Sequence, residues 1–340
     1  MIREVLESLL AGRDLDRETM TACFAALMGG EWSEPHQAAF LVALRAKGET
    51  PAEVAAAAAV LRRFAVPVTT QRRPLVDTCG TGGDGAHTLN ISTAAALLVS
   101  ACGVGVAKHG NRSVSSRCGS ADVIEALGMP LDLEPERLGD LLDAEGFAFL
   151  FAPRLHPAMR AVMPVRRALG LRTVFNLLGP LSNPAGVRRQ VVGVYSRAVQ
   201  PLVAGALAEL GAEHAWVVHG DDGLDELSVS ASTRVLEVRD GRVERELTVE
   251  PASLGIGAVD RAELAGGDAA ENAARIRAIL AGEERSAAAD AVALNAAAAL
   301  LVAGEERDLG QAFERCRGCL AEGAAAARLD AVIRRAREAK

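Results

Sequence analysis

The spacing of hydrophobic and polar residues divides the chain into an all-helical start and a mixed remainder. Residues 1–64 show apolar positions at helical spacing, and helix starts lie at 14–19 and at Thr50-Pro51-Ala52-Glu53. The second start has a Thr cap, with proline and glutamate in the first turn. Pro67 disfavours helix for the residue before it, so we expect several short helices that end at a hinge near 66–68.

Beyond the hinge, short apolar runs alternate with helical patterns. The predicted strands are 74–77, 104–107, 147–151, 190–195 and 215–218, and the predicted helices are 90–102, 134–145 and 200–211. Residues 227–250 are predicted to form an irregular β segment, with strands at 233–238 and 243–249 on either side of an Asp240-Gly241 turn. From 268 to 340 the pattern is almost all helical. This order predicts an α/β fold with a mostly parallel central sheet.

Composition narrows the classes of function. Half of the 340 residues are hydrophobic, but only one Tyr and two Trp are present, so the core is aliphatic and base-stacking platforms for nucleic acid are not expected. The net charge of −7 makes the chain a poor general binder of polyanions, so any phosphate site must be local.

Two further segments bear on location and redox chemistry. The start of the chain reads as an amphipathic helix rather than a leader, and alanine makes the stretch 286–304 too weakly apolar for a membrane span, so we expect a cytoplasmic protein. Cys316 and Cys319 form a C-x-x-C pair with no second pair nearby, which favours part of a helix over a zinc site and leaves a redox motif as the alternative.

Two polar segments follow the first predicted strand. In Asp77-Thr78-Cys79-Gly80-Thr81-Gly82-Gly83-Asp84-Gly85, the glycines allow positive φ angles and a close approach to phosphate oxygens. The segment has neither the spacing of a P-loop nor a following lysine, and a simple tight turn is the alternative interpretation. Thr88-Leu89-Asn90-Ile91-Ser92-Thr93 places more polar side chains at a helix start than one cap requires, which suggests hydroxyls directed at a ligand or metal.

Charge is concentrated in two other segments. Lys108-His109-Gly110-Asn111-Arg112-Ser113-Val114-Ser115-Ser116-Arg117 supplies cations and hydroxyls suited to pyrophosphate, with a solvated basic loop as the alternative. Asp221-Asp222-Gly223-Leu224-Asp225-Glu226 is either a surface turn or a shelf where Asp225 and Glu226 share a divalent metal. Together they indicate a metal–pyrophosphate substrate.

These motifs, in this order, resemble the anthranilate phosphoribosyltransferase family. The resemblance rests on GTGGD, NIST, KHGNRSVSS, HPAMRAVMPVRRALGLRTVFNLLGPLSNPAG at 156–186 and HGDDGLDELS at 219–228, and it extends over roughly residues 1–338. It implies transfer of the phosphoribosyl group of phosphoribosyl pyrophosphate (PRPP) to the amine of anthranilate, with release of pyrophosphate, in tryptophan biosynthesis.

The resemblance also implies the site residues. PRPP would be bound by Gly80, Gly83, Asp84, Thr88, Asn90, Ile91, Ser92, Thr93, Lys108, His109, Gly110, Asn111, Arg112, Ser113, Val114, Ser115, Ser116 and Ser120. Anthranilate would contact Gly80, Asn111 and Arg166, with His109 and His156 lining its path. Two Mg²⁺ ions would be held by Ser92, Asp225 and Glu226. No acid or base catalyst is implied, and Arg166 has a surface helix cation as its alternative.

The same resemblance implies a domain plan and a homodimer. A small helical domain would comprise 1–65 and a returning segment near 165–185, and a large α/β domain would comprise 74–164 and 186–340. Hinge closure would bring Arg166 toward the phosphate site. The alternatives are a pyrimidine nucleoside phosphorylase of the same fold and a non-catalytic relative that binds nucleic acid, although no nucleic-acid or membrane partner is expected.

Overall fold

The computed structural model describes residues 2–83, 85–113 and 117–338. Its α-helices are α1 (Ile2–Leu10), α2 (Arg17–Met28), α3 (Glu34–Lys47), α4 (Pro51–Phe64), α5 (Ile91–Ala101), α6 (Ser120–Ala126), α7 (Pro135–Glu145), α8 (Ala152–Leu155), α9 (Met163–Leu169), α10 (Phe175–Leu181), α11 (Gln200–Glu209), α12 (Ala269–Leu280), α13 (Ala287–Ala303), α14 (Leu309–Ala321) and α15 (Ala324–Glu338). Short 3₁₀ turns lie at Pro157–Ala161, Arg197–Val199, Pro251–Leu254 and Arg261–Leu264.

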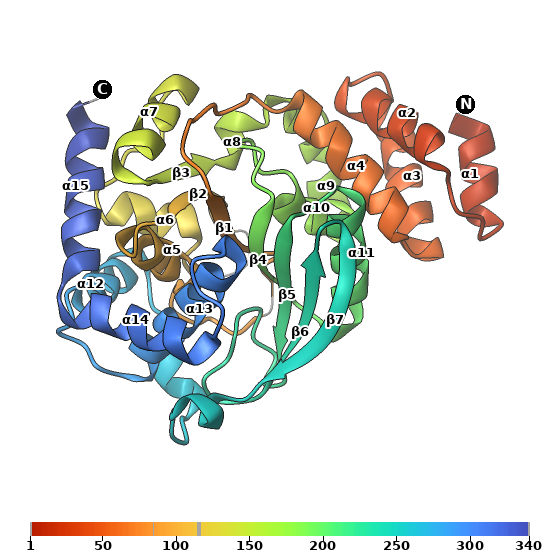
Figure 1. Cartoon of the computed structure of the whole chain (residues 1–340). Helices are drawn as coiled ribbons and strands as arrows, with labels where there is room; N and C mark the ends of the chain where they lie inside the picture. The colour runs from red at the N-terminus through yellow and green to blue at the C-terminus, as the bar shows by residue number, and fades with distance from the viewer. Residues whose placement is uncertain (1, 84, 114–116, 339–340) are drawn as a thin grey trace.

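A seven-stranded sheet forms the centre of the molecule (Figure 1). Its strands are β1 (Leu75–Gly80), β2 (Gly105–Gly110), β3 (Phe147–Phe151), β4 (Arg189–Gly193), β5 (His214–Gly220), β6 (Thr233–Arg239) and β7 (Arg242–Val249). The order is β3-β2-β1-β4-β5-β6-β7, with the first five strands parallel and β6 and β7 antiparallel. The predicted mostly parallel sheet and the hairpin after it are confirmed.

Helices cover both faces of the sheet because its side chains alternate. On β5, Trp216 and Val218 belong to the core shared with α5 and α13, whereas Ala215 and Val217 belong to the core shared with α4, α10 and α11. Figure 1 shows these two helical layers on opposite sides of the strands. The alanines of α13 are buried, and their small size permits close packing against α5 and the sheet.

The helical start of the chain follows its local signals. Asp16 caps α2 by accepting a hydrogen bond from the Thr19 N–H at 2.7 Å. Thr50 and Glu53 exchange a capping pair at 3.2 and 2.8 Å, which fixes the first turn of α4. Both predicted helix starts are confirmed. Figure 1 shows α1–α3 projecting from the rest of the molecule, with the two termini on opposite sides.

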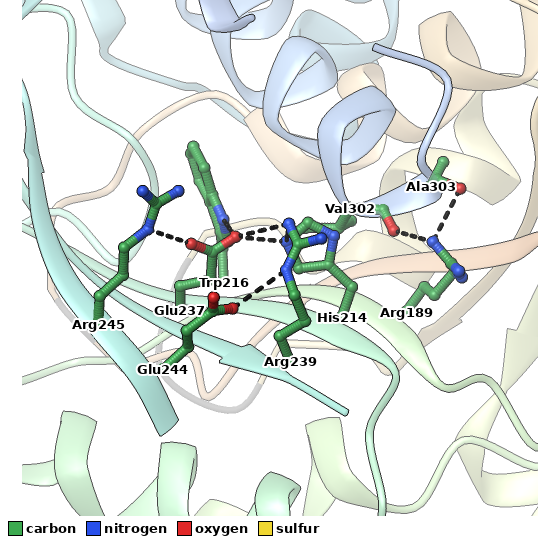
Figure 2. Close-up of polar contacts among 9 residues, drawn as sticks. All are labelled: Arg189, His214, Trp216, Glu237, Arg239, Glu244, Arg245, Val302 and Ala303. Carbon is green, nitrogen blue, oxygen red and sulfur yellow. Dashed lines mark hydrogen bonds and ion pairs between the residues drawn. The ribbon is translucent and has the colours of Figure 1, made fainter. Parts of the chain in front are cut away.

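A buried charge network fastens the hairpin to the sheet (Figure 2). Glu237 on β6 is 1% exposed and accepts hydrogen bonds from Arg245 at 2.6 Å and Arg239 at 3.1 Å, while its Oε1 lies 2.7 Å from His214 Nε2. Burial raises the pKa of Glu237, but these bonds outweigh it and lower that pKa to about 2. Since His214 begins β5 and Arg239 ends the antiparallel β6, the network lies at the edge opposite the carboxyl ends of the parallel strands.

The two remaining expectations concern the cysteine pair and membranes. Cys316 and Cys319 lie in α14, so the helical interpretation of C-x-x-C is confirmed. Across the described residues, none of the helices combines the length and the apolar character that a bilayer crossing needs.

Candidate active site

The topology itself marks the site. Chain connections run from β1 outward to β2 and β3 on one side, and β4 and β5 extend the sheet on the other. In a parallel sheet, ligands bind beyond the carboxyl ends of the strands where this direction switches. Here that point lies between Gly80 and Gly193, the paired last residues of β1 and β4.

The glycine loop begins at this switch point. Gly82, Gly83 and Gly85 have φ angles of 63°, 79° and 73°, a backbone region that other residues rarely adopt. Thr81 is tied to β4, since its N–H donates to the Gly193 carbonyl at 2.9 Å. The predicted loop conformation is therefore present, although Asp84 lies outside the described residues.

The carboxylates of the acidic turn at 221–226 have two different roles. Asp222 accepts hydrogen bonds from Ser228 at 2.7 Å and Ser230 at 2.5 Å, so it stabilises the turn itself. Asp225 instead reaches the glycine loop, where its Oδ2 accepts the Gly82 N–H at 3.1 Å. A β-carbon on Gly80 would lie 2.8 Å from the same oxygen, so glycine at the end of β1 leaves room for this carboxylate.

Asn295 fixes the position of the acidic turn and was missed by sequence reasoning. Its side chain, 4% exposed within α13, accepts the Leu227 N–H at 3.0 Å and donates to the Leu227 carbonyl at 2.9 Å. Both backbone groups of the residue after Glu226 are thus held by one amide. The signal that could have found it is a polar residue inside a run of alanine and leucine.

Lys108 brings positive charge beneath this turn. Its side chain is 2% exposed, and its Nζ donates to the Thr78 carbonyl and lies 3.5 Å from Ser92 Oγ. Burial lowers the pKa of Lys108, and the negative charges of Asp77, Glu226 and Asp225 oppose that shift. Ser92, Lys108 and the carboxylates therefore meet at the carboxyl end of β1.

Other residues of the basic segment already have partners within the protein. Arg112 is paired with Asp122 at 2.8 Å and with Glu125 at 2.9 Å, so an anion at this position must compete with two carboxylates. Ser120 Oγ donates to the Asn111 carbonyl at 3.2 Å, which closes the loop onto α6. Val114, Ser115 and Ser116 lie outside the described residues.

The polar helix start has two kinds of residue. Ile91 and Thr93 are 0% and 1% exposed, and their backbone N–H groups already donate to the Leu89 carbonyl at 2.6 Å and the Asn90 carbonyl at 3.1 Å. Asn90 forms no side-chain cap of α5 in the described structure; it donates to the Cys118 carbonyl at 3.2 Å and accepts from Asn272 at 3.0 Å. Asn272, distant in sequence, is a second residue that we missed.

His109 and His156 form a neutral pair with fixed tautomers. The His109 Nδ1 lies 3.1 Å from the Gly179 carbonyl, which only accepts, so Nδ1 carries the proton. The His109 Nε2 then accepts from the His156 Nε2 at 3.1 Å, which leaves His156 Nδ1 as a buried acceptor with no partner among the described residues. Burial lowers the pKa of His109 to about 3 and that of His156 to about 4.

Arg166 lies on α9 with its guanidinium carbon 5.0 Å from the centroid of the Phe175 ring. Burial lowers its pKa, and no ion pair joins it to another side chain in the described part of the chain. No hydrogen bond there links it to Gly80 or Asn111 either. The structure thus gathers the phosphate and metal candidates, while Arg166 stands apart from them.

The oxygen donors suit magnesium better than a softer metal. No group of three or more His, Cys, Asp or Glu side chains in the described ranges is arranged to hold a metal. Mg²⁺, however, commonly uses one or two carboxylates and completes its shell with phosphate and water. Asp225 and Glu226, with the Ser92 hydroxyl across Lys108, are a donor set of that kind.

Comparison with known proteins defines the class. Residues 3–65 match the helical bundle domain of a glycosyl transferase family, and residues 72–326 match the a/b domain of the same family. The chain is therefore a transferase of this glycosyl transferase class.

Similarity to individual proteins shows which family within this class the chain belongs to. The chain is 50% identical to an anthranilate phosphoribosyltransferase of Anaeromyxobacter sp. (strain K), over 98% of each chain. The anthranilate phosphoribosyltransferase of Thermus thermophilus superimposes with a TM-score of 0.93 at 46% identity, over 98% of this chain and 99% of that one. The Saccharomyces cerevisiae enzyme in complex with PRPP and Mg gives 0.92 at 26% identity, over 99% and 98%. The chain belongs to the anthranilate phosphoribosyltransferase family.

Proposed function

We propose that this chain transfers the phosphoribosyl group of PRPP to the amine of anthranilate, giving N-(5-phosphoribosyl)anthranilate and pyrophosphate in tryptophan biosynthesis. The observation that carries the proposal is the bond between Asp225 and the Gly82 N–H, which joins the acidic turn to the glycine loop at the switch point. A pyrimidine nucleoside phosphorylase and a nucleic-acid-binding relative are not favoured, because the relatives that match along the chain are anthranilate phosphoribosyltransferases.

The chemistry requires orientation and charge stabilisation more than proton transfer. The aromatic amine of anthranilate is neutral near pH 7, so its nitrogen attacks without a strong base. Arg166, stacked on Phe175 and without an ion pair in the described structure, suits the anthranilate carboxylate. Well-oriented bound reactants supply on the order of 7–11 kcal/mol toward the barrier.

Asp225, Glu226 and Ser92 would hold magnesium, and we propose two ions per chain. Mg²⁺ bound there would offset the negative charge that develops on the departing pyrophosphate. Lys108 supports the same charge from its place beside Thr78 and Ser92, and backbone N–H groups of the glycine loop would bind phosphate oxygens. The PRPP contacts predicted from the resemblance are proposed with these roles.

We also propose the predicted domain plan, with 1–65 and a segment near 165–185 moving against 74–164 and 186–340. Bonds of the connecting segments support it. In the linker, the Val66 N–H donates to the Leu155 carbonyl of the large part at 2.8 Å, and the Val68 N–H donates to the Pro184 carbonyl of the returning segment at 3.2 Å. Within the small part, Arg62 Nε donates to the Leu181 carbonyl at 2.7 Å and so ties the returning segment to α4. They gather the connecting segments at one place, as a hinge requires.

A homodimer through the helical domain is proposed as well. Its support is a set of exposed apolar side chains on α1, α3 and α4: Leu10, Val42 and Phe64 are 75%, 40% and 37% exposed. Light scattering after size exclusion tests this state directly. A cytoplasmic location stays a prediction from the sequence.

The function is tested by mixing the protein with anthranilate, PRPP and Mg²⁺ and following anthranilate fluorescence. We expect the fluorescence to fall, pyrophosphate to appear in equal amount, and a chelator to stop both. Folded protein that leaves anthranilate unchanged but cleaves a pyrimidine nucleoside with phosphate would establish the alternative enzyme.

A further inference from the structure

Arg172 holds the glycine loop from a distant part of the chain. It lies between α9 and α10, and its Nη2 donates to the Gly83 carbonyl at 2.6 Å. Its guanidinium carbon lies 4.0 Å from the centroid of the Tyr195 ring. The same guanidinium is therefore stacked on one side and hydrogen-bonded at its edge, an arrangement that arginine allows and lysine does not.

In the part of the chain that the structure describes, Arg172 has no carboxylate partner. Arg112, Arg234 and many other arginines form ion pairs with Asp or Glu, but Arg172 forms none within residues 2–83, 85–113 and 117–338. Its side chain is exposed, and Gly83 takes one of its five N–H donors. A partly immobilised guanidinium with no ion pair in these ranges, beside a loop that we propose binds phosphate, favours an anion there.

Tyr195 connects this arginine to the start of the loop. The Tyr195 backbone N–H donates to Thr81 Oγ1 at 3.0 Å, and Thr81 is itself bonded to Gly193. The loop is thus held at Thr81 by β4 and at Gly82 by Asp225, with Arg172 fixing Gly83. Because glycine has no side chain, its backbone is free to adopt both signs of φ, and the bond from Arg172 favours the conformation with a φ of 79° at Gly83.

We propose that Arg172, stacked on Tyr195, is a positioning residue that holds the glycine loop in the conformation that receives PRPP. This inference rests on the function proposed above. Arg172 also follows Arg166 on the segment that would return to the helical domain, so one segment acts on both substrates: Arg166 on anthranilate and Arg172 on the loop for PRPP.

Steady-state kinetics of four variants and a control test the proposal. Arg172→Gln should raise the KM for PRPP about tenfold, as expected when one charged hydrogen bond and one stacking contact are lost. Arg172→Lys should recover only part of this loss. Tyr195→Phe keeps the ring and should resemble wild type, whereas Tyr195→Leu should resemble Arg172→Gln. Arg137→Gln, on exposed α7, is the matched control and should change nothing.

The KM for anthranilate should stay within about twofold of the wild-type value, because the lost hydrogen bond is made to the glycine loop for PRPP and not to the anthranilate site. Equal losses for both substrates, or Tyr195→Phe as damaging as Tyr195→Leu, would overturn the positioning role. If the wild-type protein itself fails to consume anthranilate, the proposed function fails first, and the second readout below still applies to the contact between Arg172 and Tyr195.

That readout uses the single tyrosine of the chain. Protein labelled with ¹³C-tyrosine gives one set of ring signals, which belong to Tyr195. We expect these signals to move in Arg172→Gln and, in wild type, on addition of PRPP with Mg²⁺. Ring signals that are identical in wild type and Arg172→Gln would show that the stacked arrangement does not exist in solution.

Discussion

Gly193 leaves the space in which the acidic turn lies, and Gly193→Ala tests whether the turn must lie there. A β-carbon on Gly193 would be 2.6 Å from the carbonyl carbon of Asp225 and closer still to its oxygen. The φ angle of Gly193 is not in the left-handed region, so the backbone of β4 accepts alanine. The requirement at this position is therefore for space alone.

The size of the effect follows from that distance. Carbon atoms in ordinary contact are about 3.5–4.0 Å apart, so the Asp225 carbonyl carbon must retreat by at least roughly 1 Å, and its oxygen, which lies closer, by more. Overpacking of this kind costs about 1–3 kcal/mol of stability. A displacement of about 1 Å at a group that positions substrate costs on the order of 100-fold in rate. A 100-fold loss corresponds to about 2.7 kcal/mol, so it should be plain in a variant that still folds.

The assay compares kcat/KM from anthranilate fluorescence with the free energy of unfolding in urea, for Gly193→Ala and Gly318→Ala. Gly318 lies inside α14 with no atom within 4 Å of its added β-carbon, so alanine there should stabilise the protein by about 0.5–1 kcal/mol and leave activity intact. A folded Gly193→Ala variant with kcat/KM within twofold of wild type would refute the assignment of Asp225 to the site.

Three further predictions concern the proposed metal site at Asp225 and Glu226 and the charge network around Glu237. The double variant Asp225→Asn, Glu226→Gln should lose magnesium-dependent turnover but keep its circular dichroism spectrum and unfolding midpoint; full turnover would remove the metal assignment. Asn295→Leu leaves both Leu227 backbone groups without their partner, so it should raise the Mg²⁺ concentration needed for half-maximal rate and cost about 1–3 kcal/mol in urea unfolding. Glu237→Gln should cost about 2 kcal/mol at pH 7, less than a fully buried pair because its arginine partners are 47% and 62% exposed. The pKa of Glu237 falls from 4.5 to about 2 on folding, so its contribution is complete above pH 4.5 and disappears as the pH falls toward 2; a deficit that is equal at pH 7 and pH 2.5 would contradict this account.

The sequence predicted those parts of the fold that local chemistry determines. Thr50 and Glu53 specify a helix start within four residues, and the structure contains that capping pair. The Asp240-Gly241 turn lies between β6 and β7 as expected, because residues that tolerate positive φ are needed there. The glycine loop was predictable for the same reason.

Partners that are distant in the chain were not predictable from one sequence. Arg112 looked like a free phosphate ligand, but Asp122 and Glu125 on α6 pair with it once the loop folds back. Asn295 meets Leu227 across 68 positions, and Asn272 meets Asn90 across 182. Such contacts depend on how α12 packs against α5 and α6 and on how α13 packs against the sheet, whereas hydrophobic patterns specify which face of a helix is buried but not its polar neighbour.

The charges of the site explain how an acidic chain binds a polyanion. Lys108 is the buried cation of the site, and the carboxylates of Asp77, Asp225 and Glu226 all act on it. Asp77 is 0% exposed, and this burial raises its pKa, while Lys108 and the hydrogen bonds from Asn183 at 2.8 Å and the His109 N–H at 3.3 Å oppose that shift. Negative charge therefore exceeds positive charge around Lys108, and pyrophosphate adds more. Divalent cations on Asp225 and Glu226 would offset that negative charge, so we expect magnesium to be needed because of the charges around Lys108 as well as because of the chemistry of the leaving group.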